Sequence, residues 1–167
     1  NLAVIPETLT MWDQAWREQR ERYAWLVADA AAEGATEPDI IGLAKASPFR
    51  LRCAYRWTVE TTVYLRSGWQ GRGIGRELYD RVLSISRRQG YRKAIGGITL
   101  PNPASVSLHE RFGVRHVGTM PRVGWKFGKW HDVGCWELEF DGGDLQQPPE
   151  NTLLVADSLS KWPLPAS

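Results

Sequence analysis

Three closely spaced glycines, Gly71, Gly73 and Gly75, lie between an apolar segment and an amphipathic segment. Glycine lets the backbone approach a ligand closely, and the first turn of a helix presents unpaired backbone N–H groups that attract anions. The arrangement therefore indicates a site for a phosphate or pyrophosphate group. The same pattern is also found in tight turns that bind no ligand, so the flanking sequence must distinguish a ligand-binding loop from a plain turn.

Two well-known phosphate loops do not fit this segment. No Gly-Lys-Ser/Thr sequence is present, which excludes a P-loop. The dinucleotide-binding fingerprint needs a glycine three places after Gly73, and Arg76 stands there. The order Gln70, Gly73, Gly75 instead resembles the Gln/Arg-x-x-Gly-x-Gly loop of the GNAT acetyltransferase superfamily, in which the loop holds the pyrophosphate of coenzyme A.

Glu60 is the candidate general base because it lies within an apolar strand pattern. Burial raises the pKa of a carboxyl group toward the range in which it accepts protons near neutrality. Strand alternation places Glu60, Thr62 and Tyr64 on one face, with Glu60 and Tyr64 about 13 Å apart. We expect Glu60 to act on an amine through a water molecule. The alternative is a structural ion pair with Arg52 or Arg56.

The charge pattern favours a small anionic partner. Of the 21 basic residues 16 are arginine, which binds carboxylates and phosphates in a planar fashion, and the net charge is only +2. Arg50 and Arg52 share one face of an extended segment and are candidates to clamp a substrate carboxylate or phosphinate. The alternative for both is a solvated surface. The near-neutral balance without a basic cluster argues against nucleic-acid binding.

No metal site and no membrane association are expected. Cys53 and Cys135 lack metal-ligand spacing, and the Trp130-His131-Asp132 turn is interpreted as a structural hairpin or a pocket rim. No segment approaches the about 20 apolar residues that a membrane helix needs. No basic-then-apolar signal segment opens the chain, so we expect a cytoplasmic protein.

The chain is long enough for one domain, expected over residues 1–140, with an extended or disordered tail at 141–167. Helical patterns interleaved with strand patterns and closing hairpins indicate an α+β or mixed α/β sheet. Apolar periodicity and turn residues predict helices at 10–22, from 74 to about 90, and at 104–112. They predict strands at 23–28, 40–46 (broken by Ser47-Pro48), 54–65, 93–99, 114–119, 123–127 and 133–140.

Three segments, 52–64, 100–110 and 126–134, resemble the phosphinothricin acetyltransferase family within GNAT. The resemblance covers most of residues 1–140. It implies the GNAT acyl-CoA N-acyltransferase fold, a mixed central sheet flanked by helices, with the family's first strand and helix falling before Asn1. It also implies a homodimer that transfers acetyl from acetyl-CoA to the α-amine of a small glutamate-like amino acid. The alternatives are another amine (a peptide N-terminus, a polyamine or an antibiotic) or a non-catalytic acyl-CoA-binding module.

The resemblance also implies site residues. The expected acetyl-CoA contacts are Val63, Tyr64, Leu65, Gln70, Gly71, Arg72, Gly73, Ile74, Gly75, Arg76, Asn102 and Ser105. The expected substrate contacts are Arg50, Arg52, Tyr64, Thr99 and Val133, with Thr99 standing where the closest members carry glycine.

His109 stands where most GNAT enzymes carry a tyrosine that resembles a general acid for the departing thiolate. An imidazole, with a pKa near ~6.5, is a candidate for the same proton transfer at neutral pH. The alternative is a histidine that packs against the sheet and bonds to a backbone carbonyl.

Overall fold

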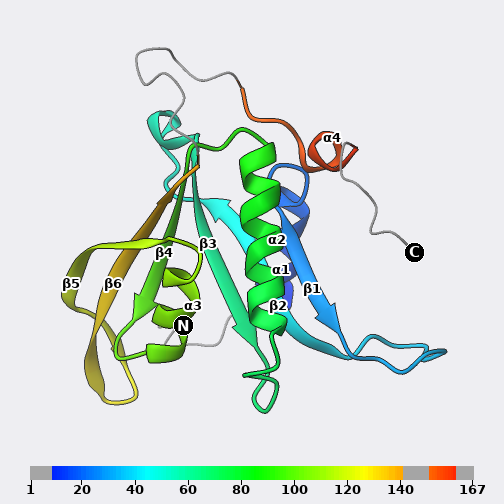
Figure 1. Cartoon of the computed structure of the whole chain (residues 1–167), viewed down its shortest axis with the longest axis horizontal. Coiled ribbons are helices and arrows are strands. Elements are labelled where there is room, and N and C mark those ends of the chain that lie inside the picture. The colour runs from blue at the N-terminus through cyan, green and yellow to red at the C-terminus, as the bar shows by residue number, and fades with distance from the viewer. Residues whose placement is uncertain (1–8, 141–150, 161–167) are drawn as a thin grey trace.

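A computed structural model describes residues 9–140 and 151–160 as a six-stranded mixed sheet with helices on both faces (Figure 1). The strand order is β1-β2-β3-β4-β6-β5, and only β3 and β4 run parallel. The predicted mixed α+β fold is confirmed. The strands are β1 Trp25–Asp29, β2 Ile40–Pro48, β3 Thr58–Leu65, β4 Lys93–Thr99, β5 Arg115–Lys126 and β6 Lys129–Glu139; the helices are α1 Leu9–Gln19, α2 Ile74–Arg88, α3 Pro103–Glu110 and α4 Val155–Leu159.

Helix α2 carries the main core on one face of the sheet. Its apolar stripe, which includes Leu78, Val82 and Ile85, is buried. Ala44 and Ala46 on β2 are fully buried beneath α2. Their small side chains let the helix pack closely against the strand. Burying one side chain such as Val82 contributes roughly 1.5–3 kcal/mol. The amphipathic helix predicted after the glycine loop is confirmed, and its apolar face packs against the sheet.

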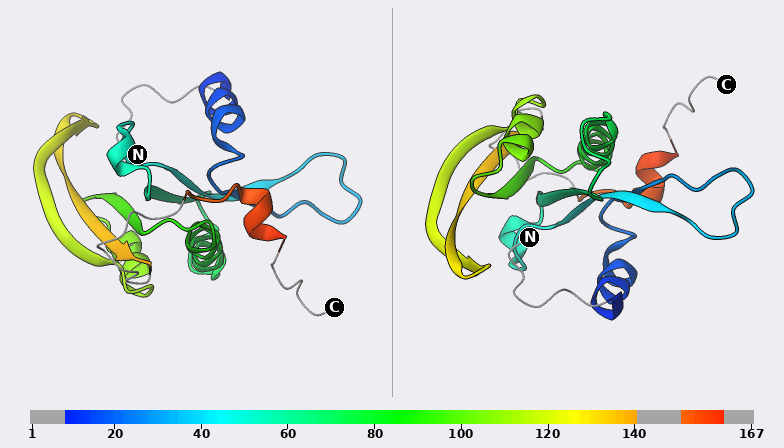
Figure 2. Two further views of the ribbon diagram at one scale, coloured as in Figure 1. Left: turned by 90° about the horizontal axis from the view of Figure 1, so that it is seen from above. Right: turned by 90° about the horizontal axis from the view of Figure 1, so that it is seen from below.

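Helix α1 covers the opposite face of the sheet from α2, as the views along the sheet show (Figure 2). Trp12 of α1 packs edge-on against Trp25 of β1, with ring centroids 5.8 Å apart. Each face of β1–β3 therefore has its own helix. Within the described ranges, no helix is both long and apolar enough to cross a membrane.

Strands β3 and β4 separate toward their carboxyl ends (Figure 1). Their pairing extends only from Thr58 opposite Lys93 to Glu60 opposite Ile95. Beyond that point β3 continues along β2 as far as Leu65, while β4 continues along β6 as far as Thr99. One backbone edge of β3, from Thr61 to Leu65, is consequently left without a neighbouring strand in the described structure.

The segment before β3 corrects the prediction of one strand over 54–65. Cys53–Tyr55 forms a 3-10 turn, and β3 begins only at Thr58. Phe49 packs edge-on against Tyr55 at 5.9 Å, which folds the chain back instead of extending it. The predicted break at Ser47-Pro48 is also wrong. Pro48 pairs with Val59 beyond the last β1 partner, so its missing N–H interrupts no ladder bond.

The strands predicted at 114–119 and 123–127 are one strand, β5. Its register against β6 shifts between Met120 and Gly124, and Arg122 has φ 50° there. This bulge accommodates Pro121, which cannot donate a ladder bond, without ending the strand.

Part of the predicted tail packs on the domain. The Leu153 N–H donates to the Gln89 carbonyl at 2.8 Å, and Gln89 Nε2 donates to the Leu153 carbonyl at 3.0 Å. The Val155 N–H donates to the Glu21 carbonyl at 2.8 Å. The fully buried amide of Gln89 requires such partners, so residues 151–160 are docked rather than extended. Residues 141–150 and 161–167 lie outside the described residues.

Candidate active site

The free edge of β3 turns two backbone N–H groups toward the gap left by β4. Arg66 donates its N–H to the Ile41 carbonyl at 2.8 Å, on the β2 side. Because ladder bonds alternate along an antiparallel pair, Tyr64 also faces β2, whereas Val63 and Leu65 face the opposite way. The cleft therefore has a wall of strand donors ready to bind an extended ligand.

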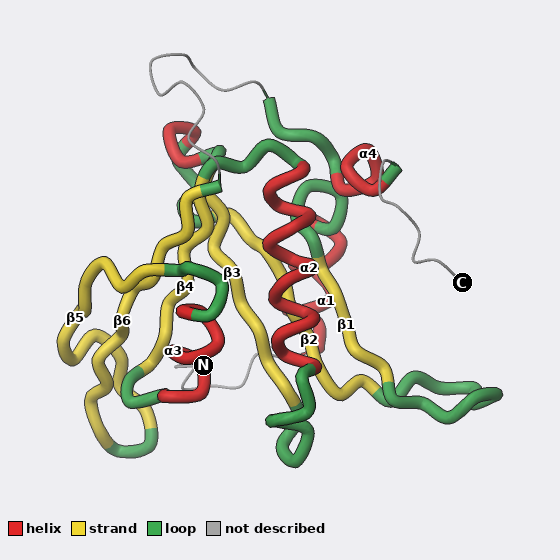
Figure 3. Tube along the Cα trace, in the orientation of Figure 1, coloured by secondary structure: helices red, strands yellow, loops and turns green. Residues whose placement is uncertain are grey.

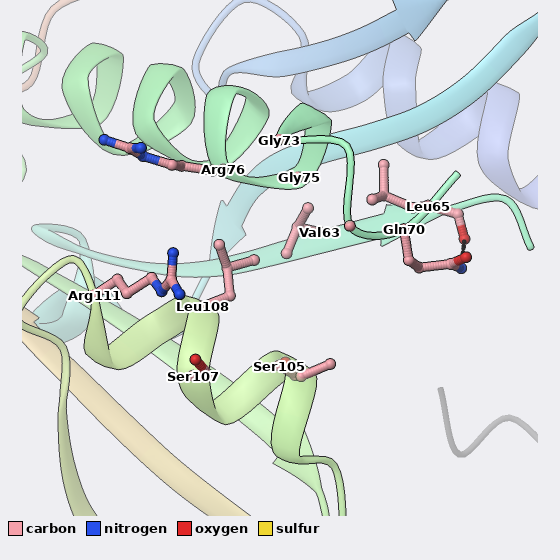
Figure 4. Close-up of a pocket in the computed structure, with 12 residues that line it drawn as sticks. Val63, Leu65, Gln70, Gly73, Gly75, Arg76, Ser105, Ser107, Leu108 and Arg111 are labelled. Carbon is pink, nitrogen blue, oxygen red and sulfur yellow. Dashed lines mark hydrogen bonds between the residues drawn. The ribbon is translucent and has the colours of Figure 1, made fainter. Parts of the chain in front are cut away.

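A cavity of about 540 Å³ lies along this edge, between the start of α2 and one side of α3 (Figure 4). It is lined by Val63, Leu65, Gln70, Gly71, Gly73, Gly75, Arg76, Ala104, Ser105, Ser107, Leu108 and Arg111. Eight of the twelve residues expected to contact acetyl-CoA are among these, namely Val63, Leu65, Gln70, Gly71, Gly73, Gly75, Arg76 and Ser105.

The glycine loop follows β3 and leads directly into α2 (Figure 3). Gly71 and Gly73 have φ angles of 76° and 84°, which L side chains rarely adopt, and Gly73 is the N-cap of α2. Gln70 fastens the loop to the strand: its Oε1 accepts from the Gly68 N–H at 2.9 Å, and its Nε2 donates to the Leu65 carbonyl at 3.5 Å. The loop thus aims the N-terminal N–H groups of α2 into the cavity.

Two arginines flank this cavity, Arg76 on α2 and Arg111 just after α3 (Figure 4). Arg111 was missed by the sequence analysis. The available signal was its position four residues after Ser107, which places both on one helical face. Cationic groups on both walls, together with the α2 N-terminus, make the cavity suitable for a diphosphate.

Replacing Arg111 with alanine is expected to weaken acetyl-CoA binding about fivefold, because an exposed ion pair contributes up to about 1 kcal/mol. Isothermal titration calorimetry measures the effect, which should shrink at high salt. Arg81→Ala is the matched control, since Arg81 lies on the exposed side of α2 and pairs with Glu77. Equal affinity of the Arg111→Ala and Arg81→Ala proteins would remove Arg111 from the site.

A second cavity of about 350 Å³ adjoins the first, and Val63 and Ser105 line both. Its walls are Glu60, Thr61, Thr62, Val63, Tyr64, Gly97, Ile98, Thr99, Asn102, Ser105, His109 and Val133. Tyr64, Thr99 and Val133, three of the expected substrate contacts, are brought together here with both candidate catalytic residues. Asn102, expected at the cofactor, lines this second cavity and caps α3 by accepting from the Ser105 N–H at 3.1 Å.

Glu60 is half-buried at the point where β3 and β4 part. The Glu60 Oε1 atom lies close to Gly97: a side chain at position 97 would bring its Cβ to 3.7 Å from that oxygen. Burial raises the pKa of the Glu60 carboxyl, and attraction to the Lys45 ammonium partly offsets this. Neither Arg52 nor Arg56 contributes to this shift, so the ion pair considered from the sequence is not supported.

His109 is almost fully buried on α3, with its Nδ1 2.8 Å from the Ser105 carbonyl oxygen. This contact requires a proton on Nδ1, which donates to that oxygen. The ring packs against Tyr79 at a centroid distance of 4.6 Å and lies close against Gly96, where an added Cβ would meet Nε2 at 2.7 Å. Burial lowers the pKa of His109, which favours the neutral imidazole with Nε2 as an acceptor.

Four expected contacts do not line either cavity. Arg50 lies over the rings of Phe49 and Tyr55 and is exposed, and Arg52 is exposed as well. The Arg72 guanidinium stacks on Trp69 at 4.6 Å, and Ile74 packs against the core. Aromatic neighbours hold Arg50 and Arg72 in positions that sequence spacing does not reveal.

The side chains of the Trp130-His131-Asp132 turn stabilise the β5–β6 hairpin. His131 Nε2 contacts the Lys126 carbonyl at 3.0 Å, and an Asp132 carboxylate oxygen accepts from the Arg122 N–H at 2.8 Å. Both groups close the β5–β6 hairpin and its bulge. Across the described residues, no three His, Cys, Asp or Glu side chains gather as a metal site would require.

A sheet that splays beside a glycine loop and a helix N-terminus defines a nucleotide-type cofactor cleft, opening onto a smaller cavity with a half-buried carboxyl group. Residues 4–114 match the acetyltransferase (GNAT) family. The chain belongs to this family and is an acetyl-CoA-dependent N-acetyltransferase.

Curated relatives and solved structures agree. A phosphinothricin N-acetyltransferase of Streptomyces viridochromogenes is 40% identical over 149 residues, covering 89% of this chain and 76% of that protein. An L-methionine sulfoximine/L-methionine sulfone acetyltransferase of Pseudomonas aeruginosa is 38% identical, covering 77% and 73%. The crystal structure of a phosphinothricin acetyltransferase from Sinorhizobium meliloti in complex with acetyl-CoA is 30% identical with a TM-score of 0.76, covering 91% and 80%.

Proposed function

We propose that this enzyme acetylates the α-amine of a small glutamate-like amino acid of the phosphinothricin, methionine sulfoximine or methionine sulfone type. The observation that carries the proposal is the pair of adjoining cavities that share Val63 and Ser105, with Glu60 in the smaller one. A volume of about 350 Å³ suits an amino acid rather than a large acceptor. The names of the relatives point to the same substrate class.

In this proposal the larger cavity holds acetyl-CoA, which supplies the acetyl group as a thioester. The backbone N–H groups of Val63 and Leu65 bind its extended arm, and the Val63 N–H is placed to polarise the thioester oxygen. The α2 N-terminus, with Arg76 and Arg111, binds the pyrophosphate. Three features support the fit: an N–H edge without a strand partner, glycines at positive φ, and two flanking cations.

Glu60 is the proposed general base. An α-amine with a pKa near ~8 is mostly protonated at neutral pH and cannot attack until it loses a proton. Glu60 accepts this proton, directly or through one water, in the smaller cavity. Its raised pKa brings the carboxyl closer to that of the amine, which favours the transfer.

A substrate screen tests the proposed function. With acetyl-CoA present, we expect thiol release with phosphinothricin, methionine sulfoximine and methionine sulfone at far higher kcat/KM than with a peptide N-terminus, a polyamine or an aminoglycoside. Fast turnover of one of the latter would replace the proposed substrate class. Tight acetyl-CoA binding without turnover of any amine would indicate an acyl-CoA-binding module instead.

The substrate carboxylate also needs a recognition group. Arg50 and Arg52 stay proposed for this role, although both are exposed and lie outside the cavities. If they contribute, Arg50→Ala and Arg52→Ala raise KM for the amino acid more than for its neutral ester. Equal effects on acid and ester return both arginines to the solvated surface.

The acid role of His109 can be tested in the same assay. His109→Phe is expected to keep acetyl-CoA affinity and to lower kcat, with His109→Tyr restoring part of it. Because burial lowers the pKa of His109, the difference should grow toward low pH, where the imidazole carries its second proton. A lowered melting temperature with unchanged kcat at every pH would mean that His109 only packs against Tyr79 and Gly96.

The proposed homodimer is supported by the β5–β6 hairpin. β5 is an edge strand of the sheet, and the hairpin exposes large apolar side chains: Val117, Met120, Val123, Trp125, Phe127 and Trp130. An edge strand with exposed apolar groups is a ready surface for a second chain. We expect Trp125→Glu to reduce the mass measured by light scattering from dimer to monomer. A wild-type monomer at micromolar concentration would contradict the proposal.

A further inference from the structure

Lys45 of β2 lies on the same face of the sheet as Glu60. It is directly opposite Thr62, and Glu60 is opposite Ser47, so Lys45 and Glu60 are diagonal neighbours about 7–8 Å apart in backbone position. This is the face covered by α1. The lysine was not singled out by the sequence analysis, because nothing in its local pattern connects it with residues fifteen positions later.

Two indole rings from two other elements hold the Lys45 ammonium. Its Nζ lies 4.4 Å from the ring centroid of Trp12 on α1 and 4.5 Å from that of Trp25 on β1. Trp25 is also the direct cross-strand partner of Lys45. Cation–π contacts with tryptophan are the strongest of their kind, and two of them restrict a side chain that is otherwise very flexible.

Lys45 is the charged group whose attraction acts on Glu60 against the effect of burial. The other titratable side chains that line the Glu60 cavity are Tyr64 on β3 and His109 on α3. β4 and β6 contribute Gly97, Ile98, Thr99 and Val133, which do not titrate, and the α1 contact, Trp12, is neutral. Among the described residues around this carboxyl group, Lys45 is therefore the fixed cation.

We propose that Lys45, clamped between Trp12 and Trp25, is a positioning residue that keeps Glu60 ionised and so able to accept the proton of the substrate amine. The inference rests on the proposed function, in which Glu60 is the general base. Lys45 does not touch the acceptor in this role. Without a nearby cation, the pKa of a partly buried carboxyl group is higher, so a larger fraction of it carries a proton and cannot accept one from the amine.

The test measures the titration of the Glu60 carboxyl group and, separately, the pH dependence of turnover. Glu60 is followed by NMR with ¹³C-carboxyl glutamate, its resonance identified by its loss in Glu60→Gln. In Lys45→Met, which keeps the length and shape of the side chain, the midpoint of the Glu60 titration is expected to move to higher pH. The acid limb of kcat/KM should move with it, each pH unit costing about tenfold in turnover on the acid side.

Three further variants sharpen the result. Lys45→Arg should restore the wild-type midpoint, because the cation is kept. Trp12→Leu should shift it in the same direction as Lys45→Met but less, because one half of the clamp remains. Lys93→Met is the matched control: Lys93 is a sheet lysine that pairs with Glu137 at 2.9 Å, and its loss should leave both profiles unchanged.

The outcomes separate this inference from the proposed function. A moved Glu60 midpoint with an unchanged activity profile supports the Lys45–Glu60 coupling and rejects Glu60 as the base. A Glu60 midpoint that stays in place in Lys45→Met overturns the inference. If KM for the amino acid rises at the same time, Lys45 binds the substrate anion instead. In a Glu60→Gln background, a further change of the pH profile on adding Lys45→Met would also overturn it.

Discussion

Replacing Glu60 with glutamine is expected to lower kcat by about 10²–10⁴-fold near neutral pH, the usual contribution of a positioned base. Glutamine keeps the size and hydrogen-bonding capacity of the side chain but cannot accept a proton. Because Glu60 lines the smaller cavity and not the larger one, acetyl-CoA affinity should change little. Steady-state kinetics and calorimetry together measure this difference.

The role of Glu60 as a base also predicts how the reaction rate depends on pH. The wild-type rate should rise as pH passes upward through the raised pKa of Glu60, because only the ionised carboxylate accepts a proton. Glu60→Gln should lack this rise, and its deficit should shrink at high pH, where the amine is already neutral. Glu137→Gln is the control, since Glu137 is a largely buried strand carboxylate paired with Lys93 and Arg115. A deficit that stays equal at all pH values would indicate a structural role for Glu60.

Replacing Gly73 with valine is expected to weaken acetyl-CoA binding by about 10- to 150-fold. Gly73 has φ 84°, a conformation that a β-branched residue adopts only with strain. The loop is expected to move, so that the N–H groups at the start of α2 lose their aim at the pyrophosphate. A hydrogen bond to a charged group contributes about 1.5–3 kcal/mol, which gives this range.

Gly34→Val separates cofactor binding from backbone strain. Gly34 also has φ 84°, has open space around its Cβ position, and lies in the β1–β2 connection, away from the cleft. Both variants should lose similar stability, measured by thermal melting, but only Gly73→Val should lose affinity in calorimetry. Unchanged affinity in a folded Gly73→Val protein would reject the loop as the pyrophosphate site.

The local features of the site could be predicted from the sequence. The glycine loop, the periodicity of α2 and the extent of β4 depend on residues within one or two turns of each other, and all are found as expected. The alternation of β3 predicts that Glu60 and Tyr64 share one face, and both residues line the smaller cavity. The resemblance of short motifs identified the family, because ligand-binding loops need particular residues at fixed spacing.

What only the tertiary structure decided involves residues distant in the chain. The separation of β3 from β4, which creates the cleft, depends on β4 pairing with β6 some forty residues later. Arg111 reaches the cofactor cavity because α3 packs beside that gap, whereas Arg50 is drawn onto Phe49 and Tyr55. Lys45 meets Trp12 and Glu60 only when α1, β2 and β3 assemble. The spacing of residues within a segment determines which side chains that segment presents. The partners of each charged group and the shape of each cavity depend instead on packing between distant segments, and the sequence of one segment does not indicate which other segments will pack against it.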